Sequence, residues 1–366
     1  MALTERECWF WLCSREWLGV RSIDKLLGYF KTAKNIYYGR NSQYEQVKGI
    51  SKKIYDRLCS DKEKDEEALK RSIDRLERSG GRFLSRVDDG FPEKLKHIYD
   101  VPAGLFYYGR MPEKNQPMIA IVGAREAGAY GLEAARYFGR ELAKQGIGVI
   151  SGLARGIDGE SHRGALEGGG LTWGVLGCGL NICYPRENYP IFEQMKRQGG
   201  IISEYTLDVA PKAWHFPMRN RIISGLSDGV LVIEARSRSG SLITADMGLE
   251  QGKNIYALPG SFQSSLSAGC HELIQNGAKL VFRPEDILED YPVNLKEKKG
   301  FDEKMKLTLD NSEQLVYASL RLNPKDVDTI SADCGLSLKE TIRILTNLEL
   351  EGKIRSMGQN QYVVRL

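Results

Sequence analysis

From Pro117 onward, short apolar runs alternate with amphipathic helical patterns, and this alternation limits the fold more than any other feature of the chain. The runs predicted as strands are Met118–Val122, Ile147–Ile150, Leu171–Leu176, Gly200–Ser203, Val230–Ile233, Asn254–Ala257 and Leu280–Phe282. The helical patterns between them are Leu132–Gln145, Ser161–Glu167, Tyr189–Gln198, Asn220–Leu226, Leu242–Gln251 and Glu272–Asn276. This alternation predicts an α/β fold with a doubly wound, mostly parallel sheet. Ligands of such sheets bind beyond the carboxyl ends of the strands, so function is sought there.

Different patterns flank this region. Residues 1–85 are predicted to be helical, with two glycine turns, at Gly19–Leu27 and Val47–Leu58, of the helix-hairpin-helix (SAM-like) kind. Such a turn offers backbone N–H groups to a phosphate, and the alternative is a plain helical turn capped by Ser22 or Ser51. Residues 86–290 are expected to form the core, and the polar, charged residues 291–310 a linker.

Residues 311–366 carry three helical patterns followed by a hairpin, which predicts a winged helix. The third helix begins with the capping-box sequence Ser337–Glu340 and has charges of both signs. A protein-binding role for this helix is therefore at least as good an interpretation as entry into the DNA major groove.

Composition limits the classes of function. A chain of 366 residues is long enough for two or three domains, and its net charge of +4 permits a nucleic-acid partner without requiring one. Seven scattered cysteines without a CxxC pair indicate reduced thiols, hence a cytoplasmic protein, and neither a disulfide framework nor a metal site is expected. The N-terminus has no sustained apolar stretch, so no signal peptide or membrane span is expected.

The turn after the first core strand, Gly123 to Gly131, contains neither GxGxxG nor a Walker sequence. Its glycines still allow the backbone to approach a phosphate at a helix N-terminus. Arg125 adds a planar guanidinium suited to phosphate, although a structural salt bridge is the alternative.

After the second strand, Gly152, Arg155 and Gly156 form another candidate phosphate-binding turn. A dinucleotide-binding fold needs an acidic residue where this chain has Ser151, so no nucleotide cofactor is expected. Asp158 and His162 stand one helical turn apart and could act as an acid–base pair, but such a pair more often caps a helix.

Two basic, hydroxyl-rich clusters flank the strand Val230–Ile233. Unpaired charge is expensive to bury, so these clusters make sense if an anion docks against them. Phe216 could stack on a base or belong to the core. The candidate residues are Phe216, Arg219, Asn220, Arg221, Arg238, Ser239, Gly240 and Ser241.

Several phosphate-binding turns along one sheet edge favour a polyanion over a single phosphate. The sequence shows no paired carboxylates, nucleophile–base dyad or metal-ligand cluster beside them. These residues therefore indicate a non-catalytic nucleic-acid-binding protein that prefers single strands.

The motifs occur in an order that resembles the DprA (Smf) family of DNA-processing proteins over the whole chain. They are Gly123-Ala124-Arg125, Tyr130-Gly131, Ser151-Gly152, Gly156-Ile157-Asp158, Tyr184-Pro185, Ser203-Glu204, Phe216-Pro217, Arg219–Ile223, Ser239–Ala245, Pro259-Gly260, Leu273-Ile274 and Gly277-Ala278. The resemblance implies a helical N-terminal domain, an extended Rossmann-like core and a winged-helix tail. It also implies binding and protection of incoming single-stranded DNA and loading of the RecA recombinase in natural transformation (competence) and DNA recombination.

The resemblance further implies a homodimer formed through the core and no catalysis. Arg125, the Ser151–Gly156 turn and the Arg219–Arg221 cluster match family positions implicated in strand binding. Two alternatives remain: a Rossmann-like enzyme acting on a nucleotide or nucleoside phosphate, and a transcription regulator whose winged helix reads duplex DNA.

Overall fold

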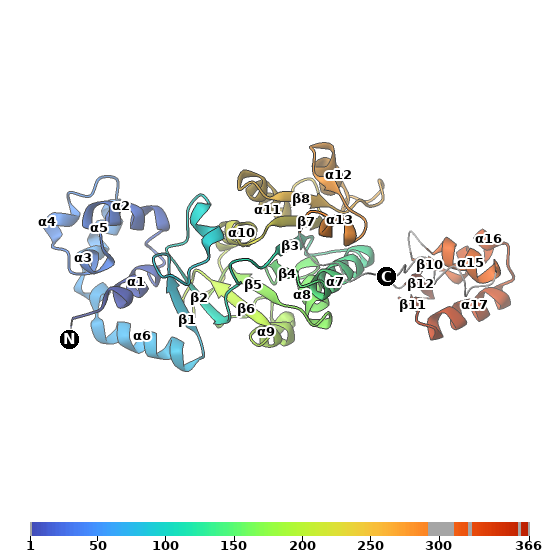
Figure 1. The fold of residues 1–366 in the computed structure, drawn as a ribbon, viewed down its shortest axis with the longest axis horizontal. Coiled ribbons are helices and arrows are strands. Elements are labelled where there is room, and N and C mark those ends of the chain that lie inside the picture. The colour runs from blue at the N-terminus through green and yellow to red at the C-terminus, as the bar shows by residue number, and fades with distance from the viewer. Residues whose placement is uncertain (1, 292–310, 321–323, 358–359, 365–366) are drawn as a thin grey trace. The chain divides into compact units, whose positions relative to one another are not determined.

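The computed structural model describes residues 2–291, 311–320, 324–357 and 360–364 of the chain (Figure 1). It contains two compact units, Met1–Val293 and Asn294–Leu366. The linker predicted for residues 291–310 lies outside the described residues, apart from Tyr291. Among the described helices, none combines the length and apolar character needed to cross a membrane.

A single nine-stranded sheet organises the described part of the first unit, in the order β1-β2-β6-β5-β4-β3-β7-β8-β9. The strands are β1 (Arg82–Ser85), β2 (Gly104–Gly109), β3 (Met118–Gly123), β4 (Gly148–Ser151), β5 (Thr172–Leu176), β6 (Gly199–Ser203), β7 (Gly229–Ile233), β8 (Asn254–Ala257) and β9 (Lys279–Leu280). All neighbours from β6 to β9 are parallel, whereas β1 and β2 join by antiparallel pairing. The predicted doubly wound sheet is confirmed, and β1 and β2 are an addition that the sequence analysis missed.

Helices cover both faces of this sheet, so successive residues of β3 are buried although they point to opposite faces (Figure 1). Ile119 and Ile121 pack on one face with Phe138 of α7. Met118, Ala120 and Val122 pack on the other face with residues of α10 and α11. These helices are α7 (Ala129–Lys144), α8 (Ile157–Glu167), η3 (Arg186–Asn188), α9 (Tyr189–Met195), α10 (His215–Leu226), α11 (Gly240–Glu250), α12 (Ala268–Gln275) and α13 (Glu285–Leu288).

The predicted helix Asn220–Leu226 starts five residues too late, because α10 begins at His215. Pro217 stands in the first turn of α10, where its missing N–H has no intrahelical acceptor to lose. The whole Arg219–Arg221 cluster is therefore helical, which decides where each of its side chains points.

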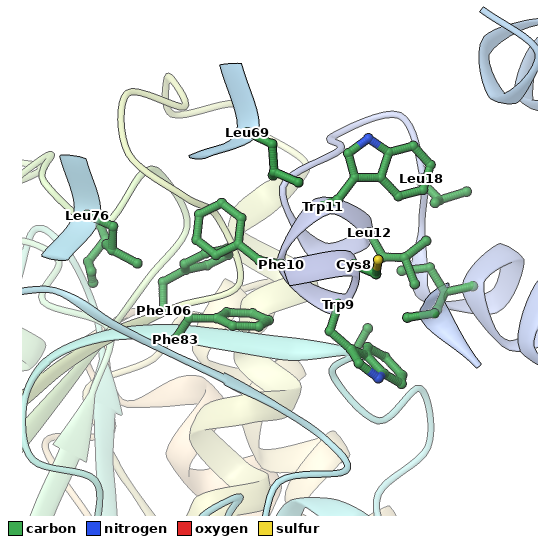
Figure 2. Close-up of a cluster of buried hydrophobic side chains, with 14 of the residues drawn as sticks. Cys8, Trp9, Phe10, Trp11, Leu12, Leu18, Leu69, Leu76, Phe83 and Phe106 are labelled. Carbon is green, nitrogen blue, oxygen red and sulfur yellow. The ribbon is translucent and has the colours of Figure 1, made fainter. Parts of the chain in front are cut away.

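The N-terminal segment is helical, as predicted, and shares a core with the edge of the sheet. Phe10 of α1 meets Phe83 of β1 and Phe106 of β2 edge-on, with ring centroids 5.3 and 5.4 Å apart (Figure 2). The division proposed at residue 85 thus falls inside one compact unit, with β1 on its N-terminal side. The remaining elements are α1 (Glu5–Cys13), α2 (Val20–Phe30), α3 (Ala33–Tyr37), α4 (Asn41–Tyr44), α5 (Lys52–Leu58), η1 (Asp61–Lys64), α6 (Glu66–Arg78) and η2 (Glu93–His97).

The second unit is the predicted winged helix. Its elements are α15 (Asn311–Ser319), β10 (Lys325–Asp326), α16 (Val327–Cys334), α17 (Leu338–Leu350), β11 (Ile354–Ser356) and β12 (Gln361–Val364). Ser337 caps α17 by accepting a hydrogen bond from the Glu340 N–H. Ile344, Leu345 and Leu348 of that helix are buried in a core separate from that of the first unit.

Replacing Phe10 should weaken the helices and the sheet together, because its ring joins their cores. We expect Phe10→Ala to lower the free energy of unfolding by about 3–5 kcal/mol and to leave one transition for the unit Met1–Val293. Urea denaturation monitored by far-UV circular dichroism gives the free energy of unfolding and the number of transitions. Phe262→Ala, at a site that is 87% exposed, is the matched control and should change stability by no more than about 0.5 kcal/mol. Separate transitions for helices and sheet would contradict the shared core.

Candidate functional site

The carboxyl end of β3, the first part of α10 and the start of α11, which follows β7, border an open pocket of about 590 Å³. This place is the switch point of the sheet, because the chain crosses from β3 to β4 on one side and β7 pairs with β3 on the other. Eight predicted site residues line the pocket: Gly123, Arg125, Phe216, Arg219, Asn220, Ser239, Gly240 and Ser241. Residues from three separate parts of the sequence are thus brought together.

Arg125 supplies the exposed positive charge of the pocket. Its guanidinium carbon lies 5.4 Å from the centroid of the Phe216 ring, in a cation–π arrangement. Within the described ranges, Arg125 takes part in no ion pair, so the structural salt bridge considered from the sequence is not observed. Its charge remains available to an anion.

Arg219 lies beneath the pocket and is only 5% exposed. Its Nη1 donates to the Val175 carbonyl oxygen, whereas its Nε has no partner among the described residues. Burial lowers the pKa of Arg219 to about 10, while the nearby Asp158 carboxylate acts to raise it. Gly152 is required here, because a Cβ at this position would lie 2.3 Å from the guanidinium.

Asp158 and His162 do not form the acid–base pair that was considered. The Asp158 carboxylate accepts a hydrogen bond from the Gly152 N–H at 3.0 Å, and burial raises its pKa. His162 is fully buried, and its Nδ1 lies 2.7 Å from the Thr172 hydroxyl. Burial lowers the pKa of His162 to about 3, so the ring is neutral at physiological pH. Asp158 is better described as the countercharge of Arg219.

Arg221 and Ser151 point into the protein instead of the pocket. Arg221 makes two hydrogen bonds to the Glu204 carboxylate, at 2.6 and 2.7 Å, and a third to the Asp100 carbonyl oxygen. It lies two residues from Arg219, roughly 200° around α10, which is why the two arginines face different ways. The Ser151 hydroxyl donates to the Ile121 carbonyl oxygen and is fully buried. Both side chains are committed to the fold.

Three other predicted residues lie beside the pocket. Arg155 is exposed and pairs with Glu187 at 2.8 Å. Gly156 has a φ of +72°, and a Cβ there would lie 2.3 Å from the Ala124 carbonyl oxygen. Arg238 lines a second hollow of about 510 Å³, which shares Ser239, Gly240 and Ile243 with the first. The start of α11 therefore lies between two adjoining hollows.

Tyr184 is a pocket residue that the sequence analysis treated only as part of a structural turn. It is 49% exposed, and its ring centroid lies 5.8 Å from that of Phe216 with a tilt of 32°. Phe216 thus lies close to both the Tyr184 ring and the Arg125 guanidinium. Its place in the pocket could have been suspected from the sequence, because Tyr184 is an aromatic residue in a turn that follows a strand.

The pocket combines fixed positive charge, serine hydroxyls, the start of a helix and flat aromatic surfaces. Such groups suit a phosphate with an attached base. In the part of the chain that the structure describes, no group of histidine, cysteine, aspartate or glutamate side chains could hold a metal ion.

Comparisons with known families agree with this chemistry. Residues 82–292 match the family model for DNA recombination-mediator protein A, and residues 304–360 match the DprA winged helix domain. The chain is 36% identical over 351 residues to Protein Smf of Escherichia coli (strain K12), covering 93% of each. It is 42% identical over 208 residues to DNA processing protein DprA of Streptococcus pneumoniae, covering 57% of this chain and 73% of that one.

Two solved structures are also similar. The X-ray structure of DprA from Streptococcus pneumoniae has a TM-score of 0.68 and 34% identity, covering 80% of this chain and 99% of that one. A structure of DNA processing protein A from Helicobacter pylori has a TM-score of 0.51 and 29% identity, covering 58% and 97%. The latter is described in terms of its unique single-stranded DNA binding mode.

Removing the partner of Arg221 should destabilise the protein, because a buried arginine would lose its countercharge. We expect Glu204→Ala to lower the free energy of unfolding by about 3–5 kcal/mol. Glu187→Ala, which unpairs the exposed Arg155, should cost less than about 1 kcal/mol. Urea denaturation measures the free energy of unfolding of both variants. If Glu204→Ala and Glu187→Ala lowered it equally, Arg221 would not be a structural residue.

Proposed function

The chain belongs to the DprA (Smf) family of DNA recombination-mediator proteins, and we propose that it binds single-stranded DNA along the carboxyl edge of its parallel sheet. The observation that carries the proposal is Arg125, an exposed guanidinium without an ion-pair partner in the described ranges, which rests on the Phe216 ring. The similarity to the Helicobacter pylori structure supports the choice of single-stranded DNA.

The phosphate contacts are assigned to the basic and hydroxyl groups around the pocket. Arg125 and Arg219 supply charge, and Ser239–Ser241 supply hydroxyls and N–H groups at the start of α11. Asn220 lies between them, its amide 3.4 Å from the Gly240 carbonyl oxygen. Arg155 and Arg238 extend the path on either side. Ser151, Gly152, Gly156 and Arg221 support the site by packing.

The bases are assigned to the aromatic surfaces. Phe216 and Tyr184 offer ring faces that any base can stack on, so binding should depend little on sequence. A duplex keeps its bases stacked on one another and cannot use these rings. The pocket therefore favours single strands.

We further infer that this is a binding activity without catalysis. The two groups that could have served as acid and base are buried and bonded elsewhere, Asp158 to Gly152 and His162 to Thr172. A protein that holds a strand by its phosphates can shield it and present it to the RecA recombinase during natural transformation, which implies a cytoplasmic location. A homodimer through the core would lengthen the DNA path, and the exposed Leu249 of α11 is apolar surface available for it.

Arg125→Ala should weaken binding to unrelated single-stranded oligonucleotides alike, because a phosphate contact carries no sequence information. The plot of log affinity against log salt should become shallower by about 0.7. Fluorescence anisotropy at several salt concentrations measures both. Arg78→Ala, on the exposed face of α6, is the control and should change neither. An unchanged affinity in Arg125→Ala would refute the proposed site.

Arg219→Ala should also weaken binding, although it leaves Asp158 buried without its countercharge.

A chain ending at Val293 should keep most of its affinity for single strands, because the unit Met1–Val293 contains the whole pocket. The same anisotropy titration compares the shortened and full chains. If the winged helix were the DNA-binding element, as in a transcription regulator, the shortened chain would lose DNA binding altogether.

A further inference from the structure

Glu234, the residue after β7, has a buried carboxylate. It has no role in the DNA contacts proposed above. It is 7% exposed, and its Oε2 accepts a hydrogen bond from the Gly128 N–H at 2.6 Å. The Gly131 N–H also hydrogen-bonds to it. Gly128 is the N-cap of α7, and glycine has no side chain that could cap the helix. The carboxylate therefore lies where the N-terminus of α7 would attract an anion.

The glycines of this turn are shaped for that carboxylate. A Cβ on Gly131 would lie 2.4 Å from the carboxyl carbon of Glu234, and a Cβ on Gly128 would lie 3.1 Å from its Oε1. From the sequence, these glycines indicated a phosphate at the start of the helix. In the structure, the protein's own carboxylate takes that place.

Glu234 also ties both ends of the loop that carries Arg125. Its carbonyl oxygen accepts a hydrogen bond from the Ala124 N–H at 2.7 Å, on one side of Arg125. Its carboxylate binds the Gly128 N–H on the other side. Glu234 has a φ of +51°, which a residue with a side chain rarely adopts, and it keeps this conformation while making both contacts.

We propose that Glu234 is a positioning residue whose carboxylate substitutes for a ligand phosphate at the N-terminus of α7. It holds the loop 124–128 so that the Arg125 guanidinium rests over Phe216, and it keeps free phosphates away from this helix. This role rests on the proposed function, since positioning matters only if Arg125 binds the strand. It also distinguishes the chain from a nucleotide-binding enzyme, which would need the same helix N-terminus for its substrate.

The test combines Glu234→Ala with Arg125→Ala and the double variant, using a single-stranded oligonucleotide as the probe. Glu234→Ala should lower affinity about tenfold, and it should have little further effect in the Arg125→Ala background, because both changes remove the same contact. Sodium formate, compared with sodium chloride at equal ionic strength, should partly restore affinity in Glu234→Ala and not in Arg125→Ala. Glu234→Gln, which keeps an acceptor oxygen and the shape of the side chain, should lose less affinity than Glu234→Ala. Glu67→Ala, at an exposed carboxylate of α6 that does not line the pocket, is the control for loss of a negative charge.

A second measurement does not depend on DNA. Inorganic phosphate should raise the Tm of Glu234→Ala by more than that of the native chain, because the variant offers the vacated helix N-terminus in addition to the pocket. The proposal is overturned if Arg125→Ala weakens binding while Glu234→Ala does not, or if the two losses add and formate restores nothing. An unchanged affinity in Arg125→Ala would instead refute the proposed function itself, and the phosphate experiment would still test the place of Glu234.

Discussion

The pairing of β3 with β4 on one side and with β7 on the other is the constraint on which the rest of the structure depends. Parallel strands end at the same edge of a sheet, and at this switch point the following helices diverge to opposite faces. The turns after β3, β4 and β7 therefore meet at one edge. A pocket forms there from segments that are more than one hundred residues apart in the sequence.

The charges at this edge have different environments and consequently different roles. Arg125 is exposed and rests on a ring, Arg219 is buried beside Asp158, and Arg221 is buried against Glu204. Burying an arginine is tolerable only with a countercharge and hydrogen-bond acceptors, and the structure supplies both for Arg221. Arg219 has a nearby carboxylate, its Nε has no partner among the described residues, and it borders the pocket. Arg125 has no ion-pair partner in the same part of the chain, so Arg125 and Arg219 are the charges that can meet a ligand.

Much of the fold follows from the sequence, because the strands of a parallel core are continuous apolar runs and the helices between them are amphipathic. Strands β1 and β2 were missed because they do not belong to the strand–helix alternation and join by antiparallel pairing. The start of α10 was missed because Pro217 looks like a helix breaker when its position in the first turn is unknown.

For the site, residue type and strand-end position brought eight candidates to the pocket, but the direction of a side chain depends on tertiary packing. Ser151 and Arg221 have the right chemistry and face inward for that reason. Glu234 was overlooked because a lone acidic residue after a strand carries no signal until its neighbours are seen. Tyr184 was recognised as part of a turn, and only the structure shows its ring beside Phe216.

The central claim is that this edge of the sheet holds a single strand by its phosphates and bases together. The most direct test is a salt titration of the full chain with a single-stranded oligonucleotide and with the duplex of the same sequence. We expect tighter binding of the single strand at every salt concentration, and a log affinity that falls linearly with log salt with a slope of about 0.7 per phosphate contact. Equal or tighter binding of the duplex, or an affinity independent of salt, would contradict it.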